Sequence, residues 1–152
     1  MLEVYRITRT RYSQDLSGEG ARLMGGRWNH VLTPCVYTSV SRALALLEYS
    51  ANTQYGHIPN DLVIMTIQVD VSEILELWDE KLPKDWLDYP APNSTKDLGS
   101  LIFNETDVKV LAVPSVIVPQ EYNYLLNPAR LVPGEARLVH TKAIDFDFRI
   151  KQ

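Results

Sequence analysis

The stretch LVIMTIQV, Leu62 to Val69, places the tightest limit on what this chain can fold into. It is nearly all apolar and rich in β-branched residues. Such a run predicts a strand buried on both faces, because a strand with one wet face alternates apolar and polar residues. With 152 residues, the chain fits one compact domain, 1–152, that can bury a sizeable core around this strand.

The segments around this strand predict a strand-rich mixed α/β fold with two or three helices. A helix is expected from residue 42 to about 55, with Ser41 as its N-cap, and a short second one through Phe103 is capped by Asn93 or Ser94. Residues 72–78 suit either a strand edge or a helical turn, and the proline-punctuated segment 83–94 predicts a loop. Further strands are expected over 3–7, 35–39, 108–119 (a strand pair or one bent strand) and 135–148, whose end puts Ile144, Phe146 and Phe148 on one face.

A glycine-rich segment, GEGARLMGGRWN, follows the first predicted strand and holds four of the seven glycines of the chain. Glycine lets the backbone approach a ligand closely, and the guanidinium of Arg27, beside Gly25 and Gly26, can grip a phosphate with two hydrogen bonds. The alternative is a loop arginine that pairs with the acidic middle of the chain.

Charge is unevenly distributed, which bears on these alternatives. Residues 1–30 carry +2, residues 61–107 carry −8, and the whole chain carries −4. An acidic protein is a poor general binder of nucleic acid, so we expect no direct contact with it. A local excess of arginine can still hold a small anion.

Glu48 is expected on the buried side of the first helix. Helical spacing groups it with Leu44, Leu47, Ala51 and Tyr55. A buried carboxylate costs free energy unless it is paired or used, so Glu48 is either a catalytic group or a structural partner of an internal arginine. Ser115, within an apolar stretch, is either part of a site or a satisfied hydroxyl.

Several classes of protein are disfavoured. The three histidines, His30, His57 and His140, lie far apart without ligand partners at metal-site spacing, and no phosphate-binding loop motif is present. Cys35 is the only cysteine, which fits a reducing cytoplasm and a small buried hydrophobe better than a nucleophile. The N-terminus lacks the apolar core of a signal peptide, and no run is long enough to span a membrane. We therefore expect a cytoplasmic protein.

Three motifs in order, GGRWN (25–29), VYTSVSRALALLEYS (36–50) and VPSVIVPQEYNYLLNP (113–128), resemble the RES domain. This family is named for an Arg, a Glu and a Ser, and the resemblance runs from VYRI near the start to residue 128. Two positions depart from the family pattern: HVLTP stands where a glycine usually follows GGRWN, and Arg130 replaces a frequent histidine. The family residues match Arg27, Tyr37, Glu48 and Ser115, and Arg6 matches a recurrent arginine.

The resemblance implies an ADP-ribosyltransferase-like fold and a bacterial toxin that cleaves the nicotinamide–ribose bond of NAD by hydrolysis or phosphorolysis. Arg27 and Arg6 would clamp the phosphates, with Gly25 and Gly26 close to them. Glu48 would stabilise the oxocarbenium-like ribose. Ser115 would position that ribose or Glu48, and Tyr37 would stack on or hydrogen-bond the nicotinamide. No metal, and no cofactor beyond NAD as substrate, is implied.

The sequence is also compatible with two other functions. A mono-ADP-ribosyltransferase would transfer the same group to a host protein, and a non-catalytic module would only hold a nucleotide. The resemblance also implies a partner, an Xre-family helix-turn-helix antitoxin that blocks the active site and supplies the DNA contact. An acidic group of the partner would face the proposed phosphate-binding arginines, Arg22 included, and the complex could contain a homodimer of this chain.

Overall fold

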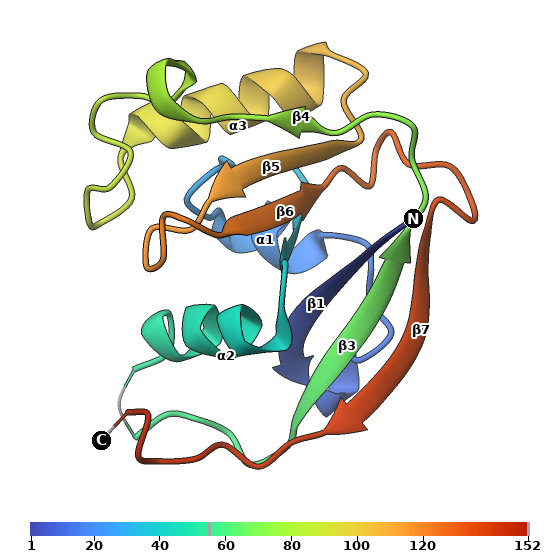
Figure 1. Ribbon diagram of the computed structural model, residues 1–152, viewed down its shortest axis with the longest axis vertical. Coiled ribbons are helices and arrows are strands. Elements are labelled where there is room, and N and C mark those ends of the chain that lie inside the picture. The colour runs from blue at the N-terminus through green and yellow to red at the C-terminus, as the bar shows by residue number, and fades with distance from the viewer. Residues whose placement is uncertain (55, 152) are drawn as a thin grey trace.

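The computed structural model describes residues 1–54 and 56–151, and a seven-stranded mixed sheet forms its centre (Figure 1). The strand order is β4–β5–β6–β2–β1–β3–β7, and only the β4–β5 pair is parallel. The expected strand-rich α/β domain is therefore confirmed. The strands are β1 (Leu2–Arg9), β2 (Val36–Ser39), β3 (Leu62–Val69), β4 (Leu75–Glu76), β5 (Val110–Pro114), β6 (Tyr122–Leu126) and β7 (Ala136–Ala143).

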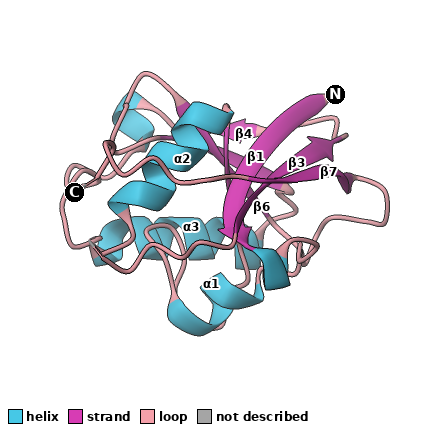
Figure 2. Ribbon diagram, turned by 90° about the horizontal axis from the view of Figure 1, so that it is seen from below, coloured by secondary structure: helices cyan, strands magenta, loops and turns pink. Residues whose placement is uncertain are grey.

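Three α-helices accompany the sheet over the described residues: α1 (Glu19–Met24), α2 (Arg42–Ala51) and α3 (Asn93–Glu105). Two short 3-10 turns, η1 (Thr10–Tyr12) and η2 (Asp79–Lys81), complete the regular structure. Helix α2 packs against β1 and β2, whereas α3 packs against β5 and β6, and Figure 2 shows the three helices from below. The glycine-rich segment, expected to be irregular, thus contains a helix of its own, α1.

Strand β3 matches its sequence prediction. It pairs along its whole length with β1, from Val69 opposite Leu2 to Leu62 opposite Arg9, and with β7 on its other edge. One face is buried throughout, with Met65 and Ile67 at 0% exposure, whereas on the other face Leu62 and Thr66 are buried and Ile64 and Gln68 are half-buried. The apolar run therefore forms an inner strand, with one face covered completely and the other in part.

The sheet consists of two portions that are barely joined. Strands β1 and β2 share a single register pair, Tyr5 with Ser39. In Figure 1, β4, β5 and β6 run across the upper part, whereas β1, β3 and β7 run diagonally below them. The Arg6 Nη1 atom donates to the Tyr37 carbonyl oxygen at 3.0 Å, which bridges the two portions where backbone pairing stops.

Helix α2 begins as predicted but ends early. The Ser41 hydroxyl accepts the Leu44 N–H at 3.0 Å, which caps the first turn. The helix ends at Ala51. Tyr55, expected at its far end, lies outside the described residues.

The side of α2 that packs is not the one predicted. Leu44, Ala45 and Ser50 are buried, whereas Leu47 and Ala51 are exposed. The grouping of Glu48 with a packed apolar face was therefore wrong in part. Helical spacing marks residues that share a side, but not whether that side meets the core or an open cavity.

Three other expectations needed correction. Helix α3 is capped by Pro92 without a side-chain cap, because Ser94 Oγ donates instead to Asp85 Oδ1 at 2.5 Å. Of the two structures left open for residues 72–78, the structure contains the strand edge, as the short strand β4 at the end of the sheet. Segment 108–119 forms one strand that ends at Pro114, and β6 was not predicted.

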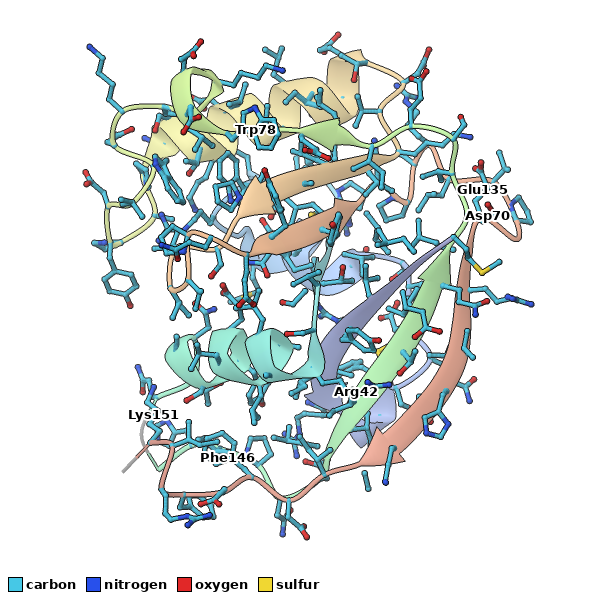
Figure 3. The ribbon with its side chains drawn as sticks, in the orientation of Figure 1. Arg42, Asp70, Trp78, Glu135, Phe146 and Lys151 are labelled. Atoms are coloured by element: carbon cyan, nitrogen blue, oxygen red, sulfur yellow. The ribbon has the colours of Figure 1, made fainter. Side chains whose placement is uncertain are left out.

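The last of these corrections concerns the tail. Strand β7 ends at Ala143, so the expected continuous face is broken: Phe146 is buried and Phe148 is 62% exposed. Phe146 packs with Ala45 of α2 and with Leu62. The Lys151 ammonium donates to the Ser50 carbonyl oxygen at 2.7 Å. The tail therefore returns beneath α2, where Figure 3 labels Phe146 and Lys151.

Candidate active site

Glu48 is the centre of the site. Its Oε1 atom accepts a hydrogen bond from Ser115 Oγ at 2.7 Å and another from Asn123 Nδ2 at 2.9 Å. Helix α2 carries the glutamate, the turn after β5 carries the serine, and β6 carries the asparagine. Three distant parts of the chain thus converge on one carboxylate, which is half-buried at the open side of α2.

Ser115 is completely buried at 0% exposure. Its oxygen accepts the N–H groups of Ile117 and Val118, each at 3.1 Å. Of the two roles expected for Ser115, the geometry favours positioning Glu48 over direct contact with a ribose, because the hydroxyl is covered and already bonded to the carboxylate.

Two adjoining cavities meet at Glu48. One, of about 320 Å³, extends along β1 and contains Arg6 and Thr8. The other, of about 450 Å³, extends along the glycine-rich segment and contains Gly26 and Arg27. Their combined size suits an elongated ligand with a part on each side of the carboxylate. Both cavities are lined by Tyr37, Glu48, Asn52 and Asn123.

Arg27 lies in the larger cavity, held by the loop before α3. Its Nη1 atom donates to the carbonyl oxygens of Trp86 at 2.9 Å and Asp88 at 2.8 Å. Burial lowers the pKa of Arg27, and the nearby Glu48 carboxylate acts in the opposite direction. Trp86 and Asp88 belong to the acidic middle of the chain, so Arg27 does contact that segment, but through backbone carbonyls and with no salt bridge among the described residues.

The turn that carries Arg27 is built around Tyr37. The tyrosine hydroxyl donates to Asn29 Oδ1 at 2.6 Å and accepts the Trp28 N–H at 3.0 Å. A Cβ on Gly26 would lie 2.5 Å from that hydroxyl oxygen, so this position needs glycine. Burial raises the pKa of Tyr37 well above its usual range, which keeps the hydroxyl protonated as a donor. Its ring, rather than its hydroxyl, is therefore the part available to a ligand.

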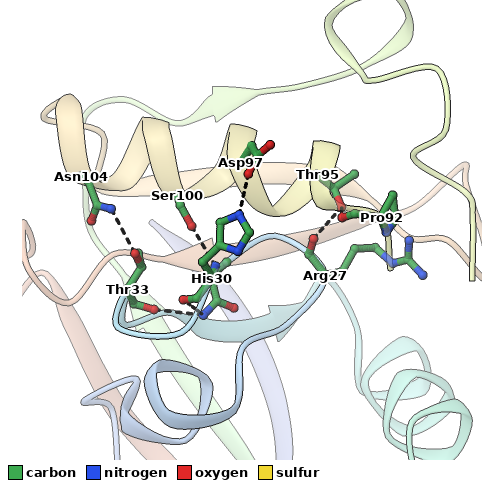
Figure 4. Close-up of polar contacts among 9 residues, drawn as sticks. Arg27, His30, Thr33, Pro92, Thr95, Asp97, Ser100 and Asn104 are labelled. Carbon is green, nitrogen blue, oxygen red and sulfur yellow. Dashed lines mark hydrogen bonds and ion pairs between the residues drawn. The ribbon is translucent and has the colours of Figure 1, made fainter. Parts of the chain in front are cut away.

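Helix α3 holds the same turn from the other side (Figure 4). The Thr95 hydroxyl donates to the Arg27 carbonyl oxygen at 2.6 Å, and Ser100 Oγ accepts the His30 N–H at 2.8 Å. Further along, Asn104 Nδ2 donates to Thr33 Oγ1 at 3.0 Å. The polar row on α3 therefore fixes the backbone of the arginine turn.

The remaining predicted residues fall in different places. Gly25 and Gly26 both line the larger cavity, next to Arg27. Arg6 lines the smaller cavity and Arg27 the larger one, and one of the Arg6 N–H groups bonds the backbone of β2. Arg22 pairs with Glu19 on α1 at 2.8 Å, so it is engaged elsewhere. Cys35 is buried, and burial raises the pKa of its thiol, as fits a small core residue.

Sequence reasoning missed two asparagines. Asn123 donates a hydrogen bond to Glu48. The sequence feature that could have identified it is a single amide within the otherwise apolar and aromatic strand β6. Asn29 is 0% exposed, and its side-chain amide donates to the carbonyl oxygens of Ala21, His30 and Thr33. Asn127 of the Asn-Pro motif instead bonds the carbonyls of Phe103 and Val108, so its role is structural.

Over residues 1–54 and 56–151, no group of three or more His, Cys, Asp or Glu side chains is arranged to hold a metal ion. In the same part of the chain, no helix has both the length and the apolar character needed to cross a membrane.

The fold and the site define a mixed α/β domain whose split sheet opens around a hydrogen-bonded glutamate flanked by two arginines. The chain belongs to the RES domain family, whose model matches residues 3–149. It is 38% identical over 127 residues to "Toxin Res" of Photorhabdus laumondii, a match that covers 82% of this chain and 81% of that protein. It is 40% identical over 125 residues to the "Prs ADP-ribosylating toxin" of a Sphingobium species, covering 80% and 77%.

A solved structure shares the fold. The chain resembles one from the crystal structure of the M. tuberculosis MbcT–MbcA toxin–antitoxin complex with a TM-score of 0.78. The match covers 95% of this chain and 84% of that one, at 22% sequence identity. At this identity, the likeness shows that the two chains share a fold.

Proposed function

We propose that this protein is the toxin of a toxin–antitoxin system and that it cleaves the bond between nicotinamide and ribose in NAD. The observation that carries the proposal is the placement of Glu48, at the junction of two cavities that each contain an arginine. A dinucleotide has two phosphates and two ribosyl groups, so it suits a cleft with cationic groups on both sides of a carboxylate. Relatives named toxins, at 38% and 36% identity, support the biological role.

The chemistry needs a negative charge beside the reacting ribose. Departure of neutral nicotinamide breaks the bond from C1′ to the ring nitrogen and leaves an oxocarbenium-like sugar. Glu48 would stabilise that charge, as carboxylates do in glycoside hydrolysis. Water would then supply an oxygen to C1′ and lose a proton, giving ADP-ribose; phosphate as acceptor would give the 1″-phosphorylated product. Arg27 and Arg6 would hold the pyrophosphate.

A second candidate function changes only the acceptor. The 40% identity to a toxin named as ADP-ribosylating Prs favours transfer of ADP-ribose to a protein side chain. Because water, phosphate and a side chain attack the same carbon, the residues around Glu48 serve all three.

An antitoxin partner is part of the same proposal. An enzyme that consumes NAD would deplete its own cell, so a tolerated gene requires restraint. The related fold in the MbcT–MbcA toxin–antitoxin complex supports a protein partner for this chain. We expect an Xre-family antitoxin that places an acidic group against Arg27 and covers the cleft, with room in the assembly for a second copy of this chain.

The deciding experiment is incubation of the purified, antitoxin-free protein with NAD, with and without phosphate. We expect chromatography to show free nicotinamide, together with ADP-ribose or its phosphorylated form. Radiolabel from adenine-labelled NAD that instead appears on added protein would favour the transferase. NAD that stays intact with phosphate, without phosphate and with added protein would contradict both functions.

A further inference from the structure

We propose that Asn123 is a positioning residue which, together with Ser115, occupies one oxygen of Glu48 and thereby presents the other oxygen to the ribose of NAD. The inference rests on the proposed function and assigns a role to a residue outside the Arg–Glu–Ser set. It depends on a chain of side-chain hydrogen bonds that runs from Ser39 through Asn123 to Glu48, and from Ser115 to the same carboxylate oxygen.

The hydrogen bonds of Ser115 have only one possible arrangement. A hydroxyl has one proton to donate and two lone pairs to accept. Both lone pairs face backbone N–H groups, those of Ile117 and Val118 at 3.1 Å. The single proton must therefore point to Glu48 Oε1, at 2.7 Å, so this oxygen acts as an acceptor.

The Asn123 end is equally determined. Its Oδ1 atom accepts the Ser39 hydroxyl at 2.7 Å, which leaves Nδ2 directed at Glu48 Oε1. Turning the amide over would set two oxygens against each other at Glu48. Ser39 and Asn123 are also register partners on β2 and β6. The sheet itself therefore sets the orientation of the amide.

These two bonds divide the carboxylate into an anchored oxygen and a free one. Oε1 accepts two hydrogen bonds, whereas Oε2 has no hydrogen-bond partner among the residues that the structure describes. Glu48 lines both cavities, so Oε2 is the oxygen available to a ribose hydroxyl or to charge on C1′. A carboxylate held in advance needs no reorganisation in the transition state, which is the advantage of a preorganised charge.

Two substitutions separate positioning from folding. Asn123→Asp keeps the acceptor for the Ser39 hydroxyl but replaces the donor at Glu48 with an oxygen. Ser39→Ala removes only the support of the amide and leaves the bond to Glu48. For Asn123→Asp, we expect kcat for NAD cleavage to fall by about 10²-fold, the usual loss for a group that acts on transition-state charge. For Ser39→Ala, we expect a smaller loss, about tenfold, because the amide is loosened and not removed.

The measurement is kcat and KM for NAD, taken well below the melting temperature of each variant as determined by circular dichroism. A positioning role lowers kcat, whereas a merely structural role lowers the melting temperature and leaves kcat per folded molecule unchanged. Asn60→Ala, at an exposed position outside both cavities, is the matched control and should keep wild-type values.

The outcomes distinguish the two levels of the proposal. A wild-type protein that cleaves NAD, with an Asn123→Asp kcat within about threefold of it, overturns the positioning role and leaves the proposed function intact. If Asn123→Asp does not fold, an unchanged kcat in Ser39→Ala overturns the role instead. A wild-type protein without NAD cleavage or transfer overturns the proposed function and this inference with it.

Discussion

Hydrogen bonds offset the loss of hydration of the Glu48 carboxylate at only one of its two oxygens. A half-buried carboxylate loses part of its hydration, and hydrogen bonds to a charged group return about 1.5–3 kcal/mol each. Ser115 and Asn123 supply two such bonds, both to Oε1. Oε2 has no hydrogen-bond partner among the described residues and is not buried, so it can meet solvent or a ligand.

Glu48→Gln should abolish NAD cleavage while the protein stays folded. The glutamine Oε1 can still accept from Ser115 and Asn123, so the local contacts survive, but the charge that would stabilise the ribose is gone. We expect a loss in kcat of at least about 10²-fold. Kinetics beside thermal melts provide the test. A glutamine variant that still cleaves NAD would remove Glu48 from the mechanism, and one that unfolds would make Glu48 a structural residue.

Arg27→Lys should not behave as a conservative change. The Arg27 guanidinium donates to two loop carbonyls through Nη1, and its other N–H groups can donate to a ligand in the cavity. Lysine has its charge on one nitrogen and lacks this planar arrangement of donors. We expect KM for NAD to rise more than kcat falls, since phosphate binding is common to the ground and transition states. Steady-state kinetics decide this, and Arg22→Lys, away from the cleft, serves as the control. An unaltered KM would place Arg27 away from the phosphates.

Helix α3 shows how an element sets the site from a distance. It contributes no residue to the cavities at Glu48, yet its Thr95 and Ser100 hold the turn that carries Arg27. The helix can approach so closely because Gly99 faces Trp28: a Cβ at this position would lie 1.9 Å from the Trp28 carbonyl oxygen.

Gly99→Ala should therefore destabilise the protein, although alanine is the better helix former. Helix propensity favours alanine by about 1 kcal/mol, but a backbone atom cannot yield to a clash of this kind, and overpacking costs about 1–3 kcal/mol or more. We expect the melting temperature to fall and NAD affinity to weaken, as the Arg27 turn is displaced. Gly20→Ala, in α1 with open space around it, is the control for stability and should not lower the melting temperature. A more stable Gly99→Ala protein would show that α3 is not tightly docked.

The turn after the arginine carries backbone strain. Leu32 has φ of +84°, in the left-handed region that favours glycine, and its side chain is 72% exposed. HVLTP is also where the RES resemblance predicts a glycine that this chain lacks. Without that glycine, Leu32 adopts a backbone conformation that glycine would adopt more easily.

Leu32→Gly should stabilise the protein. Left-handed backbone at a non-glycine residue costs about 1–3 kcal/mol, while the added freedom of glycine in the unfolded chain costs about 0.5–1 kcal/mol. The exposed leucine loses little packing, so we expect a small rise in melting temperature, measured by calorimetry. Val31→Gly, next to it and without positive φ, should lower the melting temperature instead. Equal losses in both variants would mean that Leu32 is not strained.

The split of the sheet determines where a partner must act. Strands β1 and β2 meet at one register pair, and residues of both strands line the smaller of the two cavities at Glu48. An antitoxin that covers this region would exclude NAD from Arg6 and Arg27 together.

The complex with its antitoxin should therefore show little NAD turnover, and co-expression should restore growth. Arg27→Ala should weaken the complex, because an acidic group of the partner would lose its counter-charge, whereas Arg137→Ala on the distant strand β7 should not. Calorimetric titration of each variant with the antitoxin provides the comparison. An antitoxin that binds elsewhere and leaves the cleft open and active would contradict the blocking arrangement.

Local patterns were sufficient to predict several parts of this fold. The apolar run of β3, the Ser41 cap of α2 and the burial of Cys35 each depend on near neighbours in the chain or on apolar content. The resemblance to the RES domain supplied the candidate residues Arg27, Tyr37, Glu48 and Ser115. The structure brings these four into one region.

Tertiary contacts decided the rest. Spacing placed Glu48 on the inner side of a helix, but only the packing of the tail and of β1 against Ala45 leaves that side open. Asn123 became visible only when β6, a strand that the sequence had not revealed, brought its amide within 2.9 Å of Glu48. Hydrogen-bond partners separated by 67 to 84 residues build the site around Glu48, and such pairings depend on how the whole sheet closes. Local sequence patterns contain no information about that closure, because the free energy that selects it comes from burial shared by the entire chain.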